Sequence, residues 1–274
     1  MNKSVLMWGR LATCGRLATG PASGARLFAA LAVLFPLAAL AQDARAIVAE
    51  SERRGRADSE RYEGSLEVVS ANSKVSKKSW QFVRIGSYGD SKAIIRFTAP
   101  AEVKGVALLV VNHPDRSSDQ WMWRPAYGRE TRIALQDRST RFFGTDFSFE
   151  DLEERDVNQY DYRLTGEEPI QGAACWRIES RPRQGKTSQY TLSRIWIRKE
   201  DYVPAQYENL VKDQVVRRLM QTGIRKIQGI FTACQMEMTD LRRNSKTILK
   251  LDKLEYNVPL KETDFTVQAL GRDQ

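Results

Sequence analysis

The feature that most constrains the fold of this chain is the alternation of apolar and polar side chains at every second residue. Successive side chains of a β-strand point to opposite faces of the sheet, so this period predicts strands with one apolar face. Gly, Asn, Asp or Pro, which are typical of turns, separate the alternating segments. We expect thirteen strands, near residues 61–71, 78–87, 91–98, 104–113, 119–125, 131–136, 160–166, 173–182, 188–198, 203–210, 214–226, 228–240 and 246–257.

Several of these segments are joined by short polar connections, such as Lys212-Asp213 and Asn244-Ser245. Short connections favour antiparallel hairpins, because parallel pairing needs long crossovers. Only residues 43–58 carry a long helical period, with Ile47 and Val48 set among charged residues. The sequence therefore predicts a mainly β fold: one large curved antiparallel sheet, an incomplete β-barrel with one buried face, covered by a few helices.

The alternation stops between residues 142 and 158. This segment opens with an aromatic turn that contains Phe143, Gly144 and Phe147, and Ser148 can then cap a short helix together with Asp151. We interpret the segment as a lid over the sheet.

The first 41 residues have the pattern of a secretory leader. They contain four basic residues and no acidic one, and an apolar run from Leu27 to Leu40 ends in Ala39-Leu40-Ala41. The run is shorter than the roughly 20 apolar residues of a spanning helix and contains Pro36, so a membrane anchor is the weaker alternative. We expect a signal peptide over residues 1–41 that is cleaved after Ala41, export to the periplasm, and a single domain over residues 42–274.

The charge of the chain argues against nucleic acid as a partner. Removal of the four basic leader residues lowers the net charge from +9 to +5, and the remaining charges are interspersed. Such a surface is typical of solvated strand faces and allows only peripheral contact with an anionic membrane. The acidic pairs Glu153-Glu154 and Glu167-Glu168 are interpreted as solvated turn residues.

The sequence lacks the residue patterns of common catalytic and metal sites. It has one histidine, His113, no CxxC pair, no GxSxG turn and no phosphate-binding glycine loop. We therefore expect no metal, no cofactor and no enzymatic activity, with a two-carboxylate hydrolase as a weaker alternative. Cys175 and Cys234 are compatible with two buried thiols or with a disulfide, and their spacing leaves both open.

Large apolar side chains recur at even spacing on several predicted strands, so each set shares one face. A packed core explains this pattern, and so does a ligand cavity, because one long helix cannot cover a large sheet. The methionines suit an adaptable cavity wall. The candidate residues for the cavity wall or lid are Trp80, Phe82, Trp121, Trp123, Phe143, Phe147, Met236 and Met238.

Six stretches give the chain a resemblance to a known family. They are, in order, WMWRPAYGRETRIA, RFFGTDFSFEDLEERD, CWRIESRPR, IWIRKEDYVPAQ, IQGIFTACQMEMTDL and YNVPLKETDFTVQAL, and they span most of residues 60–270. With these stretches the chain resembles the outer-membrane lipoprotein-sorting proteins, in particular the longer LolA-like group.

The resemblance implies a LolA/LolB-like fold, in which helices close an incomplete barrel around an apolar cavity. It also implies a periplasmic carrier that binds the acyl chains of a lipoprotein or lipid and moves them toward the outer membrane. The longer group is often associated with inner-membrane exporters of the resistance-nodulation-division (RND) type. An accessory module of such an exporter, without lipid cargo of its own, is therefore the alternative hypothesis.

Overall fold

The computed structural model describes residues 43–114 and 116–272, so the predicted signal peptide and its cleavage site lie outside the described residues. The described part contains one sheet of thirteen strands. The strands are β1 (Ser59–Val69), β2 (Val75–Ser87), β3 (Asp90–Ala99), β4 (Ala107–Asn112), β5 (Asp119–Arg124), β6 (Arg129–Arg132), β7 (Tyr160–Ile170), β8 (Ala173–Pro182), β9 (Leu192–Arg198), β10 (Pro204–Val211), β11 (Gln214–Ile227), β12 (Ile230–Asp240) and β13 (Ser245–Tyr256).

The strands follow the order β6-β5-β4-β3-β2-β1-β13-β12-β11-β10-β9-β8-β7, and every neighbouring pair is antiparallel. Two meanders, β1 to β6 and β7 to β13, are thus joined where the first and last strands pair. The sheet stays open between β6 and β7. The predicted mainly β fold with a single antiparallel sheet is confirmed.

The turn chemistry explains why the sequence forms hairpins. Lys212 and Asp213 between β10 and β11 both have positive φ angles, 49° and 64°. Two consecutive positive φ angles define the type I′ turn, whose twist matches that of paired strands.

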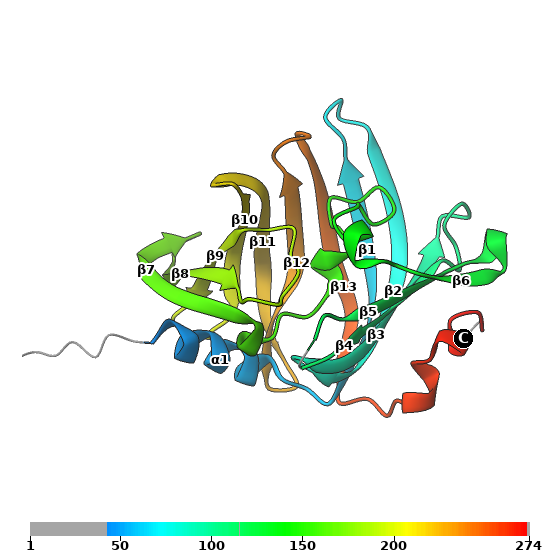
Figure 1. Cartoon of the computed structure of the whole chain (residues 1–274), viewed down its shortest axis with the longest axis horizontal. Coiled ribbons are helices and arrows are strands. Elements are labelled where there is room, and N and C mark those ends of the chain that lie inside the picture. Colours follow the sequence, from blue (N-terminus) through cyan, green and yellow to red (C-terminus); the bar gives the residue numbers. More distant parts are fainter. Residues whose placement is uncertain (1–42, 115, 273–274) are drawn as a thin grey trace, which may run out of the picture. The chain divides into compact units, whose positions relative to one another are not determined.

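Residues 133–159, which we call the crossover segment, connect β6 to β7 and lie on the inner face of the sheet (Figure 1). Phe142 and Phe149 of this segment are buried against residues of β3 and β4, such as Phe97 and Leu108. The crossover segment therefore fills the inner face of the β1–β5 half of the sheet.

Helix α1 (Ala44–Gly55) covers the other half of the inner face (Figure 1). Asp43 caps its first turn by accepting a hydrogen bond from the Arg45 amide at 3.0 Å. Ile47 and Val48 pack against β8 and β9. The predicted helix is confirmed, and it ends at Gly55.

The remaining helices are short 3-10 turns, at Pro125–Tyr127, Leu135–Asp137, Glu150–Leu152, Val157–Gln159, Glu262–Asp264 and Val267–Ala269. Among the described residues, no helix is long and apolar enough to cross a membrane.

The prediction of one buried face is wrong for part of the sheet. The C-terminal segment after β13 packs on the outer face of β3–β5, where Phe265 and Leu270 contact Ile94 and Leu109. Strand β4 (Ala107–Asn112) is therefore covered on both faces. Its unbroken apolar run, ALLVV, is the sequence signal for such a strand.

Cys175 and Cys234 are both buried free thiols, so the disulfide alternative is not found in the structure.

Candidate functional site

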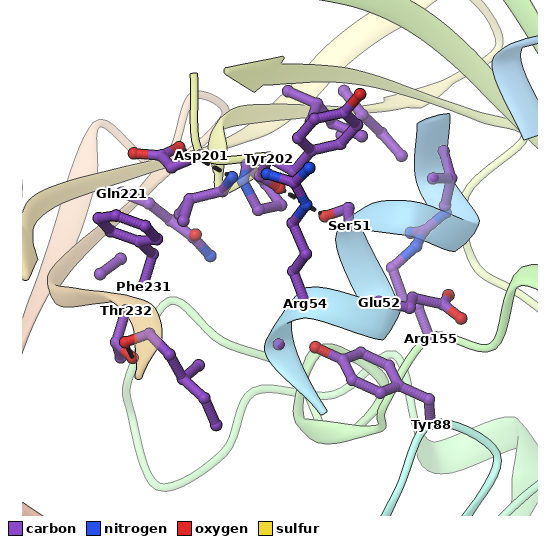
Figure 2. Close-up of a pocket in the computed structure, with 18 of the residues that line it drawn as sticks. Ser51, Glu52, Arg54, Tyr88, Arg155, Asp201, Tyr202, Gln221, Phe231 and Thr232 are labelled. Carbon is purple, nitrogen blue, oxygen red and sulfur yellow. Dashed lines mark hydrogen bonds between the residues drawn. The ribbon is translucent and has the colours of Figure 1, made fainter. Parts of the chain in front are cut away.

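Two pockets lie on the inner face of the sheet, beneath the two covering elements. The first, which we call the helix pocket, has a volume of about 310 Å³ and lies between α1, the end of the crossover segment and strands β9–β12. Ser51 and Arg54 of α1 contact Tyr202 on one side of it, whereas Glu52 lies on the side of Arg155 (Figure 2). Its apolar lining comes from Val48, Ile195, Ile197, Val203, Ile230, Phe231, Ala233 and Met236.

The second, which we call the crossover pocket, has a volume of about 260 Å³ and lies beneath the crossover segment. It is lined by Phe147, Leu219, Met236 and Met238 together with acidic residues of the crossover segment. The two pockets are contiguous, since they share Glu154, Arg155, Tyr207, Gln221 and Met236. Ligand pockets in proteins usually span about 300–1,000 Å³, and the helix pocket lies at the lower end of that range.

A buried ion-pair cluster separates the pockets from the packed core. The side chain of Arg84 is only 5% exposed, and its guanidinium lies 3.0 Å from Glu60 and 3.3 Å from Glu154. Glu154 also accepts hydrogen bonds from the Tyr88 amide and from Ser91. Charges buried in this way are stable only when they are paired, so the cluster holds Arg84, Glu60 and Glu154 in fixed positions.

The crossover segment is fixed to the sheet by buried polar contacts. Asp151 accepts a hydrogen bond from Tyr190 and lies 2.8 Å from the guanidinium of Arg217. Asp146 accepts hydrogen bonds from Ser245 and Thr247 of β13. Sequence reasoning treated this segment as a lid, and these contacts make it a fixed part of the pocket wall.

Ser148 and Asp151 form the predicted reciprocal pair, but the N-cap of the 3-10 turn Glu150–Leu152 is Phe149, one residue later than predicted. Asp151 accepts from the amide of Ser148 at 2.7 Å, and Ser148 accepts in turn from the amide of Asp151 at 3.3 Å.

The pockets shift the protonation of the groups that line them. Burial raises the pKa of Glu52 from 4.5 to about 7, and the nearby charge of Asp156 adds to this effect. Burial also raises the pKa of Tyr207 to about 12, so its hydroxyl stays protonated and can donate a hydrogen bond. The helix pocket therefore combines an apolar wall with an acid that is partly protonated at neutral pH.

Three of the eight predicted wall or lid residues line a pocket. Met236 lines both pockets, whereas Phe147 and Met238 line the crossover pocket. Trp80 and Phe82 lie on the same face but, with Phe143 of the crossover segment, belong to the packed core cluster.

Trp121 and Trp123 are separated from the other six residues. They point to the outer face of β5 (Asp119–Arg124) and pack beneath the C-terminal segment. The sequence placed each pair on one face of its strand, and it carried no signal for which face was the inner one.

The acidic pair Glu153-Glu154 was expected to be solvated, and that interpretation is wrong. The side chain of Glu153 is 6% exposed and lies 2.9 Å from Arg138, while Glu154 belongs to the Arg84 cluster. The pair Glu167-Glu168 is exposed, as expected.

Sequence reasoning also missed Arg155, Tyr207 and Glu52 as pocket residues. The run EDLEERD has the composition of an ordinary solvated turn. Its burial depends on contacts with residues far away in the chain, which the run itself does not indicate. No group of three or more His, Cys, Asp or Glu side chains that could hold a metal ion lies within residues 43–114 and 116–272.

Comparison with known proteins agrees with this architecture. A protein-family model, described as an uncharacterized protein family, matches residues 89–272, well over half of the chain. The chain belongs to this family. No curated protein matches the chain.

Among solved structures, a DUF1329 family protein from Desulfovibrio piger is similar, with a TM-score of 0.80 and 28% identity, covering 83% of this chain and 97% of that one. A domain named for outer membrane lipoprotein sorting, from Vibrio parahaemolyticus, gives a TM-score of 0.79 at 25% identity, covering 84% of this chain and 98% of that one. A LolA superfamily protein from Nitrosomonas europaea gives 0.65 at 18% identity, covering 82% and 97%, and shows the fold alone. The expected LolA-like, lipoprotein-sorting resemblance is confirmed.

Proposed function

We propose that the protein is a periplasmic carrier that binds an acyl chain of a lipid or lipoprotein in its two inner pockets and moves it toward the outer membrane. The observation that carries the proposal is the pair of contiguous pockets, lined by Met236, Met238 and isoleucines, on the inner face of a LolA-like sheet. Each buried CH₂ group of an acyl chain contributes about 0.8 kcal/mol, so binding needs no catalytic residue.

Helix α1 is the movable cover in this proposal. It has twelve residues, and isolated helices of fewer than about 12–15 residues are marginal in water. Its polar contacts come from three side chains: Ser51 donates to the Tyr202 carbonyl at 2.7 Å, Arg45 donates to the Val157 carbonyl at 2.9 Å and to Asn158 at 2.6 Å, and Arg54 lies 4.0 Å from the ring centre of Tyr202. Movement of α1 away from β8 and β9 would open the helix pocket to an acyl chain.

The test is uptake of a fluorescent fatty acid by the purified protein, together with native mass spectrometry of protein isolated from its source membrane fraction. Met236→Trp places a large ring where both pockets meet, so it should abolish most of the uptake. Gln235→Trp is the matched control, because the neighbouring side chain on the strand points to the outer face. Absence of lipid adducts combined with no uptake by the unmodified protein would refute the carrier.

The RND-type exporter implied by the resemblance stays a prediction. A pull-down from a membrane extract that recovers the exporter with the unmodified protein, in the absence of lipid uptake, would favour the accessory module over the carrier.

A further inference from the structure

Arg155 occupies the junction of the helix pocket and the crossover pocket, and it lines both. Its guanidinium donates to the hydroxyls of Ser180 at 3.0 Å and Ser193 at 3.4 Å, and it lies 4.2 Å from the ring centre of Tyr160. Both serines are buried, so they fix the guanidinium in place.

Other arginines on this face have a carboxylate partner. Arg84 pairs with Glu60 and Glu154, Arg138 lies 2.9 Å from Glu153, and Arg217 lies 2.8 Å from Asp151. Within residues 43–114 and 116–272, Arg155 has no carboxylate within ion-pair distance; its partners are neutral hydroxyls and a ring.

An arginine stays protonated under all physiological conditions and offers five N–H donors in a planar fork. Removing such a charge from water is unfavourable unless an opposite charge compensates it. The nearby acids of the crossover segment have other donors: Glu154 has Arg84, Ser91 and the Tyr88 amide, and Glu150 accepts from Ser188 and the Gln189 amide. The charge of Arg155 therefore remains available to a ligand.

We propose that the pockets take a single-chain lipid with a terminal anionic group, a carboxylate or a phosphate, which pairs with Arg155. This inference rests on the proposed carrier function. The tail lies in the helix pocket along Ile195, Ile197 and Met236, and the acidic group points inward to the junction of the pockets.

Two observations favour a single chain in this orientation. The helix pocket has a volume of about 310 Å³, at the lower end of the range for ligand pockets, which suits one chain better than several. The apolar side chains Val48, Ile195 and Ile197 lie on the α1 side of Arg155, where the pocket is covered by the helix. A lipid that enters beneath α1 with its acidic end first would meet Arg155 at the far end of this apolar wall.

The test is displacement of a bound fluorescent fatty acid by three probes with the same tail: dodecanoate, dodecyl phosphate and dodecanol. The unmodified protein should bind at least one of the two anionic probes about 10-fold to 100-fold more tightly than the alcohol, the range for hydrogen bonds to a charged group. The stronger of the two anions identifies the headgroup chemistry.

In Arg155→Met the preference for the anion should disappear while dodecanol binds as before, and Arg155→Lys should keep part of the preference. Thermal unfolding checks that both variants are folded. Arg177→Met, on the outer face of β8, is the matched control and should keep the full preference, since Arg177 bonds to Thr165 and Glu168 there.

The outcomes separate the two proposals. If no probe binds the unmodified protein, the carrier function fails. If the alcohol binds as tightly as both anions, or if Arg155→Met keeps the anion preference, the carrier function stands and the role of Arg155 is refuted.

Discussion

At the scale of single residues, Asp151 connects the crossover segment to the sheet. Its side chain is 6% exposed. The carboxylate accepts hydrogen bonds from the hydroxyls of Tyr190 and Ser148 and forms an ion pair with Arg217, at distances of 2.6–2.8 Å. Asp151→Ala leaves the charge of Arg217 buried without its closest carboxylate, so it should lower the free energy of unfolding by about 3–5 kcal/mol.

Urea unfolding measures this loss. Asp161→Ala is the control, because Asp161 and its partner Arg183 are 69% and 45% exposed, and such surface pairs contribute about 0–1 kcal/mol. Equal effects of the two substitutions would show that the crossover segment is not held by Asp151.

At the scale of elements, α1 should open more readily than the crossover segment. The helix is held mainly by Ala44, Ile47 and Val48, whereas the crossover segment is held by packed phenylalanines and buried ion pairs. Ile47→Ala removes a fully buried side chain, which typically lowers stability by about 2–5 kcal/mol. Part of this loss should appear as faster amide hydrogen exchange in α1, with residues 142–152 unchanged.

Arg53→Ala is the matched control in the same helix, since this side chain is 69% exposed. Its α1 amides should exchange nearly as in the unmodified protein. Equal acceleration in α1 and in the crossover segment after Ile47→Ala would mean that the two covers open together.

The elements themselves could be predicted because their signals are local. A two-residue period and turn residues such as Lys212-Asp213 depend only on neighbours in sequence. Each predicted strand overlaps an observed one, although the sixth, 131–136, shares only residues 131–132 with β6. The partners of Trp121 and Arg155 could not be predicted in the same way, because these side chains contact residues far away in the chain, such as Leu270 and Ser180. Sequence alone thus singled out Met236 and Met238, which line the pockets, and missed Arg155 between them.

At the scale of the whole molecule, acidic residues on the outer and inner faces should together give the free energy of unfolding a maximum at an intermediate pH. On the outer face, pairing with Arg163 lowers the pKa of Glu179 and pairing with Lys77 lowers the pKa of Glu67, so their contribution to stability is lost as the pH falls below 4.5 and through these lowered pKa values. Burial raises the pKa of Glu52 to about 7, and it also raises the pKa of Glu150 and of Glu154. The contribution of these inner acids to stability is therefore lost as the pH rises, and not as it falls.

For Glu52 the folded state binds the proton more tightly than the unfolded state, whose pKa is near 4.5. Its contribution is therefore fully present below pH 4.5 and is lost as the pH rises through about 7. We expect the free energy of unfolding to be highest near pH 5 and to fall by on the order of 1–2 kcal/mol toward pH 8, after allowance for partial solvent screening. Urea unfolding across this range measures the slope. Glu52→Gln should flatten this slope. Glu167→Gln, at an exposed carboxylate, is the control and should leave the slope unchanged. A slope that persists in Glu52→Gln would assign the pH dependence to groups other than Glu52.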